Sequence, residues 1–109
     1  MSSAESRLPE QVALSLAFPA RLEDDVLDAC RDLPALVRGY TLMAAEGFGE
    51  GVRLHSTSEL VLGRARRRIL MSIIDADQLD AVLAALRSSI ASSDVVFWTT
   101  QVGRFGRLA

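Results

Sequence analysis

The spacing of apolar residues constrains this chain most, because it alternates between the two-residue period of strands and the longer period of helices. In "QVALSLAF", residues 11–18, large apolar side chains alternate with small ones, which is typical of a strand with one face in a core. Residues 20–33 instead have helical spacing, with acidic residues in the first turn and Pro34 at the end. Their apolar stripe consists of Leu22, Val26, Leu27, Cys30 and Leu33.

Three further segments predict strands and one predicts a second helix. Strand-forming residues that end in glycines predict a strand at 36–48, and apolar residues on both faces predict another at 66–74. Residues 94–102 form the last predicted strand. Before it, Asp75 followed by Gln78 resembles a capping box. The stripe of the second helix consists of Leu79, Val82, Leu83, Leu86 and Ile90.

The resulting order is strand, helix, strand, strand, helix, strand. It predicts an α+β fold of the ferredoxin-like type, in which two helices cover one face of an antiparallel sheet. The last strand, however, carries Phe97 on one side and Trp98 on the other, and residues 66–74 are likewise apolar on both sides. An uncovered apolar sheet face of this size predicts a homo-oligomer.

Length and composition predict one cytoplasmic domain. The chain has 109 residues, half of them apolar, and a formal net charge of −2; this charge argues against a dedicated nucleic-acid or anionic-membrane binder. All twelve basic residues are arginine, which removes any lysine-dependent mechanism, and the single Cys30 cannot form an intrachain disulfide. We expect a polar tail at 1–10 without a signal peptide, a domain at 11–102 and a second tail at 103–109.

The stretch "EGFGEGVRLHSTSELVLGRARRR", residues 46–68, differs from the rest of the chain. Its glycines alternate at Gly47, Gly49 and Gly51, where backbone N–H groups suit an anion. The same glycines would equally let the chain leave a strand. They do not open a helix, so they are not a dinucleotide fingerprint.

Four arginines close this stretch, at positions 64, 66, 67 and 68. In a strand, Arg66 and Arg68 would face one way and Arg67 the other. They would either hold a phosphate through paired hydrogen bonds or pair with acidic residues at a solvated strand end. No interleaved aromatic residues accompany them, which argues against nucleic acid.

His55 is the only histidine. It would bind a metal with Glu46 or Glu50, or with Glu59; the alternative is an ordinary exposed loop histidine. One histidine in a loop does not make a Ser-His-acid arrangement. We therefore expect a protein that is not an enzyme.

The segment "GYTLMAAEGFG", residues 39–49, resembles the PII-like superfamily of trimeric signalling proteins. In that superfamily, glycine-x-threonine is followed after five residues by glycine-phenylalanine-glycine and a long T-loop. The element order is similar from Gln11 to Val102. More narrowly, "RGYT", "LGRARRR" and "FWTTQV" look like an unknown-function family, numbered 3240, whose genes tend to neighbour heavy-metal efflux systems.

This resemblance implies a cytoplasmic homotrimer with a T-loop-like segment at about 46–66 and an effector between subunits. The implied effector is an adenine nucleotide, a divalent metal ion or bicarbonate, and the implied partner is a membrane transport or efflux system. Neither nucleic-acid binding nor membrane insertion is implied. The implied ligand residues are Thr41, Gly47, Phe48, Gly49, Arg66 and Arg68.

The chain departs from nitrogen-sensing PII proteins in three places. "RSSIASSD", residues 87–94, has neither the glycines nor the lysine of their phosphate-gripping B-loop. No tyrosine lies between Gly49 and Arg68, so uridylylation is excluded. "GFGE" also replaces their "GFGRQ", which puts nucleotide binding in the nitrogen-sensor manner in doubt.

Two other classes remain open. One is a metal-tolerance protein similar to the divalent-cation tolerance (CutA-type) trimers, in which the loop itself holds the cation. The other is a small dimeric enzyme on a ferredoxin-like fold, for which the sequence supplies no catalytic set.

Overall fold

The structure, a computed structural model, describes residues 10–36, 38–49, 54 and 56–109. It confirms the predicted α+β fold. The elements in chain order are β1 (Gln11–Pro19), α1 (Glu23–Arg31), β2 (Thr41–Gly47), α2 (Thr57–Leu62), β3 (Ala65–Asp75), α3 (Leu79–Ser89) and β4 (Val96–Val102). Short 3-10 turns occupy Ala20–Leu22, Pro34–Leu36 and Ala76–Gln78.

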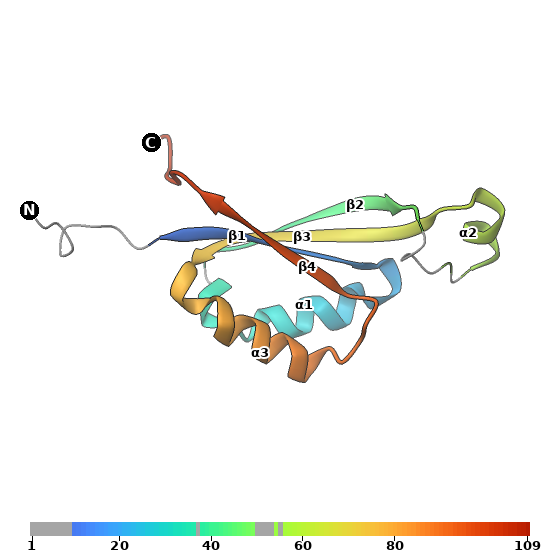
Figure 1. The fold of residues 1–109 in the computed structure, drawn as a ribbon, viewed down its shortest axis with the longest axis horizontal. Coiled ribbons are helices and arrows are strands. Elements are labelled where there is room, and N and C mark those ends of the chain that lie inside the picture. Colours follow the sequence, from blue (N-terminus) through green and yellow to red (C-terminus); the bar gives the residue numbers. More distant parts are fainter. Residues whose placement is uncertain (1–9, 37, 50–53, 55) are drawn as a thin grey trace, which may run out of the picture.

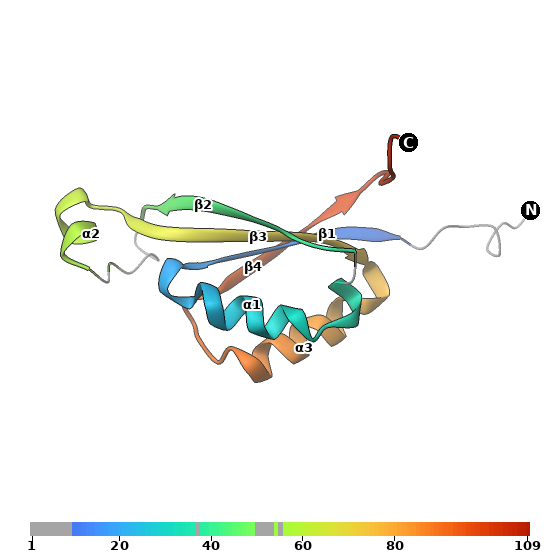
Figure 2. The same cartoon turned by 180° about the vertical axis from the view of Figure 1, so that it is seen from behind.

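The four strands form one antiparallel sheet in the order β2-β3-β1-β4. Strands β1 and β3 pair over their central positions, with Leu16 opposite Leu70 and Leu14 opposite Ser72. The edge strands β2 and β4 pair with β3 and β1 respectively. Helices α1 and α3 lie side by side against one face of this sheet, as predicted (Figures 1 and 2).

The core lies between the sheet and these two helices. Alternate residues of β1 point into it because side chains of a strand alternate between faces. Leu14, Leu16 and Phe18 are at most 3% exposed, which confirms the period-2 pattern. The other core residues are Val26 and Cys30 of α1, Leu36 of the 3-10 turn Pro34–Leu36, Leu70 and Ile74 of β3, and Val82, Leu83 and Leu86 of α3.

The opposite face of the sheet has no helix over it among the described residues (Figure 1). By the strand register, this open face is made by the residues out of phase with the core. It includes Met43 of β2, Ile69, Met71 and Ile73 of β3, and Val96 and Trp98 of β4. Met43, Val96 and Trp98 are 38%, 48% and 45% exposed. The open face is therefore strongly apolar, as the sequence indicates.

Strand β2 is shorter than the predicted 36–48. Leu36 belongs to a 3-10 turn, and Gly39 has a left-handed φ of +104° that interrupts an extended chain. The Gly39 N–H donates to the Leu36 carbonyl at 2.8 Å, and the Gly39 carbonyl accepts from the Ser72 hydroxyl at 2.8 Å. These contacts turn the chain so that β2 begins at Thr41.

The predicted capping box at Asp75 is wrong. The Asp75 side chain makes no cap hydrogen bond, because a 3-10 turn at Ala76–Gln78 separates it from α3. Its carboxylate instead pairs with the Arg38 guanidinium at 3.3 Å.

Helix α2 lies inside the segment that the sequence predicts as a long loop. The Ser56 hydroxyl accepts from the Glu59 N–H at 3.1 Å, and Gly63 ends the helix with a left-handed φ of +70°. Glu59 is only 6% exposed, and its carboxylate accepts from the Arg66 N–H at 2.6 Å. A charge-assisted hydrogen bond therefore holds α2 against the start of β3.

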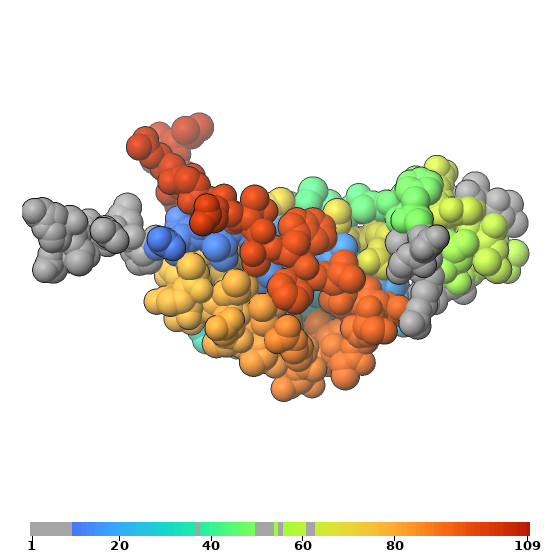
Figure 3. All heavy atoms as spheres, viewed as in Figure 1, coloured from blue at the N-terminus to red at the C-terminus, as the bar shows by residue number. Residues whose placement is uncertain are grey.

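We call residues 46–49, 54 and 56–68 the arm. It contains the end of β2, helix α2 and the start of β3, and it stands at the end of the molecule away from both termini (Figure 1). The space-filling view shows the α2 part of the arm beyond the end of α3 (Figure 3).

We predict that Cys30 makes stability depend on pH. Burial raises the pKa of the Cys30 thiol from 9.0 to about 11, so above pH 9 the unfolded chain loses this proton before the folded one does. The free energy of unfolding should then fall as pH rises from 9 towards 11, by at most about 1.4 kcal/mol per pH unit. Urea unfolding of wild type and Cys30→Ala at several pH values measures this. A wild-type advantage that stays constant from pH 8 to pH 10.5 would contradict it.

We also predict that Glu59→Ala loosens the arm without unfolding the sheet. Loss of a hydrogen bond to a charged acceptor costs about 1.5–3 kcal/mol, so amide exchange at Arg66 and Gly63 should accelerate at least about tenfold. Hydrogen exchange measured by NMR reports each amide. The control is Ser58→Ala, an exposed neighbour on α2. Equal exchange in both variants would show that Glu59 does not anchor α2.

Candidate functional site

Strand β2 links the two regions that contain the predicted ligand residues. Thr41 is its first residue, opposite Met71, and Gly47 is its last, opposite Ala65. Six steps along a strand separate the two residues by about 20 Å. Within one chain, Thr41 therefore does not meet Gly47, Phe48 and Gly49. A small ligand that contacts both sets of residues would have to take them from two different chains.

The glycine end of β2 has the geometry of a chain turn. Gly49 has a φ of +105°, in the left-handed region that favours glycine, and a Cβ added there would meet nothing within 4 Å. Its backbone conformation, rather than close contact, is the reason for a glycine here. Phe48 beside it is 65% exposed. The backbone at this end is thus accessible to a ligand or a partner.

Two of the arginines in the arm are already paired with carboxylates. Arg64 lies 3.1 Å from Glu46, and Arg68 lies 2.8 Å from Glu23 at the start of α1. The hypothesis of a solvated strand end that pairs with acidic residues therefore fits both. An anionic ligand at either position would have to compete with a glutamate.

Arg66 differs from these two. Its backbone N–H is held by Glu59, its side chain is exposed, and within the described ranges it takes part in no ion pair. Opposite Glu46 in the register, it faces the same way as Arg68, while Arg67 faces the other way, as predicted. Arg66 is therefore the predicted anion ligand most available at the arm.

The predicted metal ligands are divided. Glu46 is paired with Arg64, while His55 and Glu50 lie outside the described residues. In the part of the chain that the structure describes, no three histidine, cysteine, aspartate or glutamate residues cluster as metal ligands.

Thr41 lines a hollow of about 310 Å³ at the start of β2. The exposed aromatic residues Tyr40 and Phe105 contribute to its walls, at 37% and 51% exposure. The remaining lining residues are Arg38, Gly39, Met71, Ser72 and Ile73. A planar ring fits this chemistry, because the aromatic and apolar side chains offer contact area and the Thr41 hydroxyl offers a hydrogen bond.

Sequence reasoning missed Tyr40 and Phe105 as candidate ligand residues. Tyr40 lies inside the motif, beside Thr41, and so carried a local signal. Phe105 belongs to the C-terminal segment, and no local pattern links it to β2. Only the path of the chain after β4 brings it to this hollow.

Several solved structures share this fold. A DUF3240 family protein from Shewanella baltica OS155 has a TM-score of 0.72 at 21% identity, covering 94% of this chain and 100% of that one. Arabidopsis thaliana PII bound to citrate has a TM-score of 0.66 at 12% identity, covering 93% and 82%. CPII from Thiomonas intermedia K12, a nitrogen regulatory PII-like protein bound to ADP, AMP and bicarbonate, has a TM-score of 0.60 at 17% identity, covering 89% and 96%.

Among curated proteins, none matches this sequence. No helix in the described ranges is both long and apolar enough to span a membrane. The model of the family DUF3240, proteins of unknown function, matches residues 8–109. The resemblance found in "RGYT", "LGRARRR" and "FWTTQV" is thereby confirmed, and the fold is the one that PII proteins have. The chain belongs to the DUF3240 family.

Proposed function

We propose that this protein is a PII-like regulator, which binds a small effector in the clefts of a homotrimer and controls a protein partner through the arm. The observation that carries the proposal is the geometry of β2. One edge strand joins the Thr41 hollow at its start to the glycines of the arm at its end. A ligand bound at either end of this strand would bias the arm between two arrangements.

The effector that we favour is an adenine nucleotide. In the proposed homotrimer, its ring suits the hollow beside Thr41 of one subunit. Its phosphates suit the exposed guanidinium of Arg66 and the backbone N–H groups near Gly49 of a neighbouring subunit, because about 20 Å separates the two ends of β2 within one chain. Two structures of CPII contain bound ADP and AMP, which supports the same class. The chain lacks the glycines and lysine of a B-loop at 87–94, so we expect weaker phosphate contacts than in nitrogen sensors.

The homotrimer is part of the proposal because the open face needs a cover. Met43, Val96 and Trp98 are each more than a third exposed on it, and an apolar surface of this kind favours contact with another subunit. Neighbouring subunits would also complete the clefts that β2 borders.

The partner that we propose is a membrane transport system, in particular one for heavy-metal efflux, contacted in the cytoplasm. This part rests on the resemblance to the numbered family and its gene neighbourhoods. The exposed Phe48 and Leu60 of the arm, each 65% accessible, offer apolar contacts for such a partner. We assign the protein no catalytic step.

We predict that ADP or AMP stabilises the protein against heat. A ligand at about 100 times its Kd adds about 2.7 kcal/mol per site, and differential scanning fluorimetry detects this. Arg66→Gln should weaken binding about tenfold through loss of its phosphate contacts, and Thr41→Ala should weaken it as well. Arg31→Gln is the control, because Arg31 is 69% exposed on α1.

The same experiment includes bicarbonate, Zn²⁺ and Cu²⁺. Stabilisation by bicarbonate alone, lost in Arg66→Gln, would keep the regulator and change its effector. Stabilisation by a metal alone, lost in His55→Ala, would contradict the nucleotide proposal in favour of the metal-binding class. If none of these ligands stabilises the protein, the proposal that its effector is one of them is wrong.

We further predict that the open face holds the trimer together. Trp98→Glu places a charge on this face and should shift the mass from trimer towards monomer in light scattering, because an unpaired buried charge is costly. Thr99→Glu is the matched control, since Thr99 is exposed and points to the other face of β4. A wild-type monomer or dimer would refute the trimer directly.

A further inference from the structure

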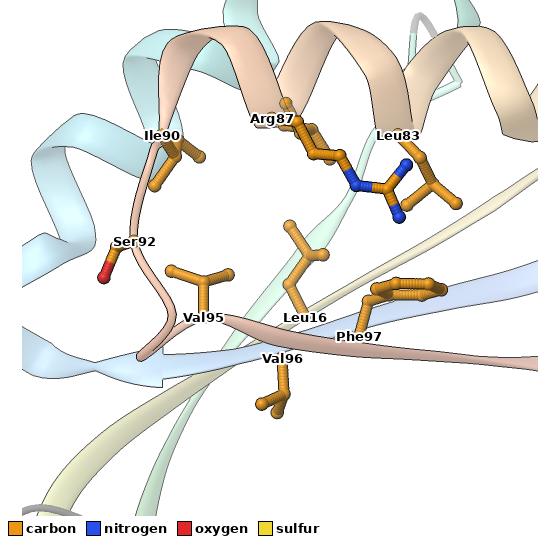
Figure 4. A pocket seen from close by; sticks show the side chains of 9 residues that line it. Leu16, Leu83, Arg87, Ile90, Ser92, Val95, Val96 and Phe97 are labelled. Atoms are coloured by element: carbon orange, nitrogen blue, oxygen red, sulfur yellow. The ribbon is translucent and has the colours of Figure 1, made fainter.

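The helix-covered side of the sheet contains a cavity at the edge farthest from β2. It lies between the last turns of α3, the connection after it, and the start of β4, and it has a volume of about 190 Å³. Its lining residues are Leu16, Leu83, Leu86, Arg87, Ile90, Ser92, Val95, Val96 and Phe97. Figure 4 shows these side chains, and Val96 among them points away from the cavity. It is separate from the Thr41 hollow and from the arm.

This cavity is a gap in the core above the edge strand. Leu16, Leu83 and Leu86 at its base are at most 9% exposed, whereas Phe97 on the same side of the sheet remains 45% exposed. Helix α3 therefore does not close over β4. Val96 points to the opposite face (Figure 4), so contacts between subunits through the open face would leave the cavity uncovered.

Arg87 is the one charged side chain among the lining residues. It extends from α3 towards Phe97 (Figure 4), and its Cζ lies 5.8 Å from the centroid of the Phe97 ring. Arginine in the last turn of a helix also suits the helix dipole. Here, however, the guanidinium lies over the Phe97 ring beside the cavity.

No acidic residue neutralises Arg87 within the described ranges. The ion pairs there involve other arginines, and Asp94, in the connection between α3 and β4, pairs with Arg21 at 3.0 Å. Ser92 lies in the connection after α3, and its hydroxyl accepts from the Asp94 N–H at 3.1 Å. The cavity thus combines an apolar interior with a single unpaired cation at its rim.

We propose that this cavity binds a small carboxylate that carries an aromatic or branched apolar group. A dry apolar cavity of about 150 Å³ already accommodates benzene, so the volume suffices for one ring. The guanidinium matches a carboxylate through two parallel hydrogen bonds, and charge complementarity therefore selects an anion over a neutral ligand of the same shape. The proposal does not rest on the regulatory function.

The test uses phenylacetate as the probe and the full chain in its native assembly. Titration followed by ¹H–¹⁵N NMR should give saturable shifts concentrated at residues 83–97, in the millimolar range expected for so small a ligand. Phenylacetamide, which has the same shape without the charge, should bind about tenfold more weakly. Shifts spread over other regions, or none at all, would overturn the proposal.

Two variants separate the carboxylate contact from general effects. Arg87→Gln should weaken phenylacetate about tenfold and remove the preference over phenylacetamide, with the rest of the spectrum unchanged because Arg87 is exposed. Arg31→Gln, which changes an exposed arginine in the last turn of α1, should bind like wild type. Equal binding by Arg87→Gln, or a change of its oligomeric mass that marks the cavity as a subunit contact, would overturn the assignment.

Discussion

The pairing of β1 with β3 is the interaction on which the rest of this structure depends. These two central strands place Leu14, Leu16 and Phe18 beside Leu70 and Ile74, and this layer is the surface on which α1 and α3 pack. Burial of such side chains contributes about 1.5–3 kcal/mol each. The same pairing supports β2 and β4 as edges, and β3 continues beyond it to Ala65 in the arm, where it pairs with β2. The Thr41 hollow and the Arg87 cavity consequently lie on opposite edges of one rigid layer.

The arm departs from the usual polarity of a surface helix. In α2 the charged Glu59 is buried and the apolar Leu60 is 65% exposed. Burial of a carboxylate is costly unless hydrogen bonds compensate it, and Glu59 accepts from the Arg66 N–H at 2.6 Å. An exposed apolar residue gains nothing in water by itself. The buried carboxylate therefore fixes α2 to the start of β3, while Leu60 remains on the surface.

The two faces of the sheet serve different purposes. The face towards the helices forms the core, and it is incompletely closed at the edge strand β4, where Phe97 is half exposed. The open face is apolar but has no helix over it in the described part of the chain. Since two helices of this length cover one face of a four-stranded sheet, the other face must either be polar or meet a further layer. Its composition favours the further layer.

Much of the fold was predictable from local patterns, because alternation and helical stripes depend on neighbours within a few residues. The core positions of β1, the stripe of α3 and the opposed directions of Arg66 and Arg67 follow from such periods alone. The capping box at Asp75 failed, since a 3-10 turn intervenes and Arg38 pairs with the carboxylate. Helix α2 was missed because six residues carry too short a pattern, and its stability depends on a contact with β3.

The sequence by itself thus determined the order of the four strands and of the two helices that cover them, the core faces, and the motif from Gly39 to Gly49 that resembles the PII-like superfamily. Only the tertiary structure decided which of these residues meet. It brought Phe105 to the hollow beside Thr41, paired Arg68 with Glu23, and set Arg87 over Phe97 beside a cavity. The physical reason is that such contacts join segments far apart in the chain. They depend on strand register and on how far each helix covers the sheet, which no local period encodes.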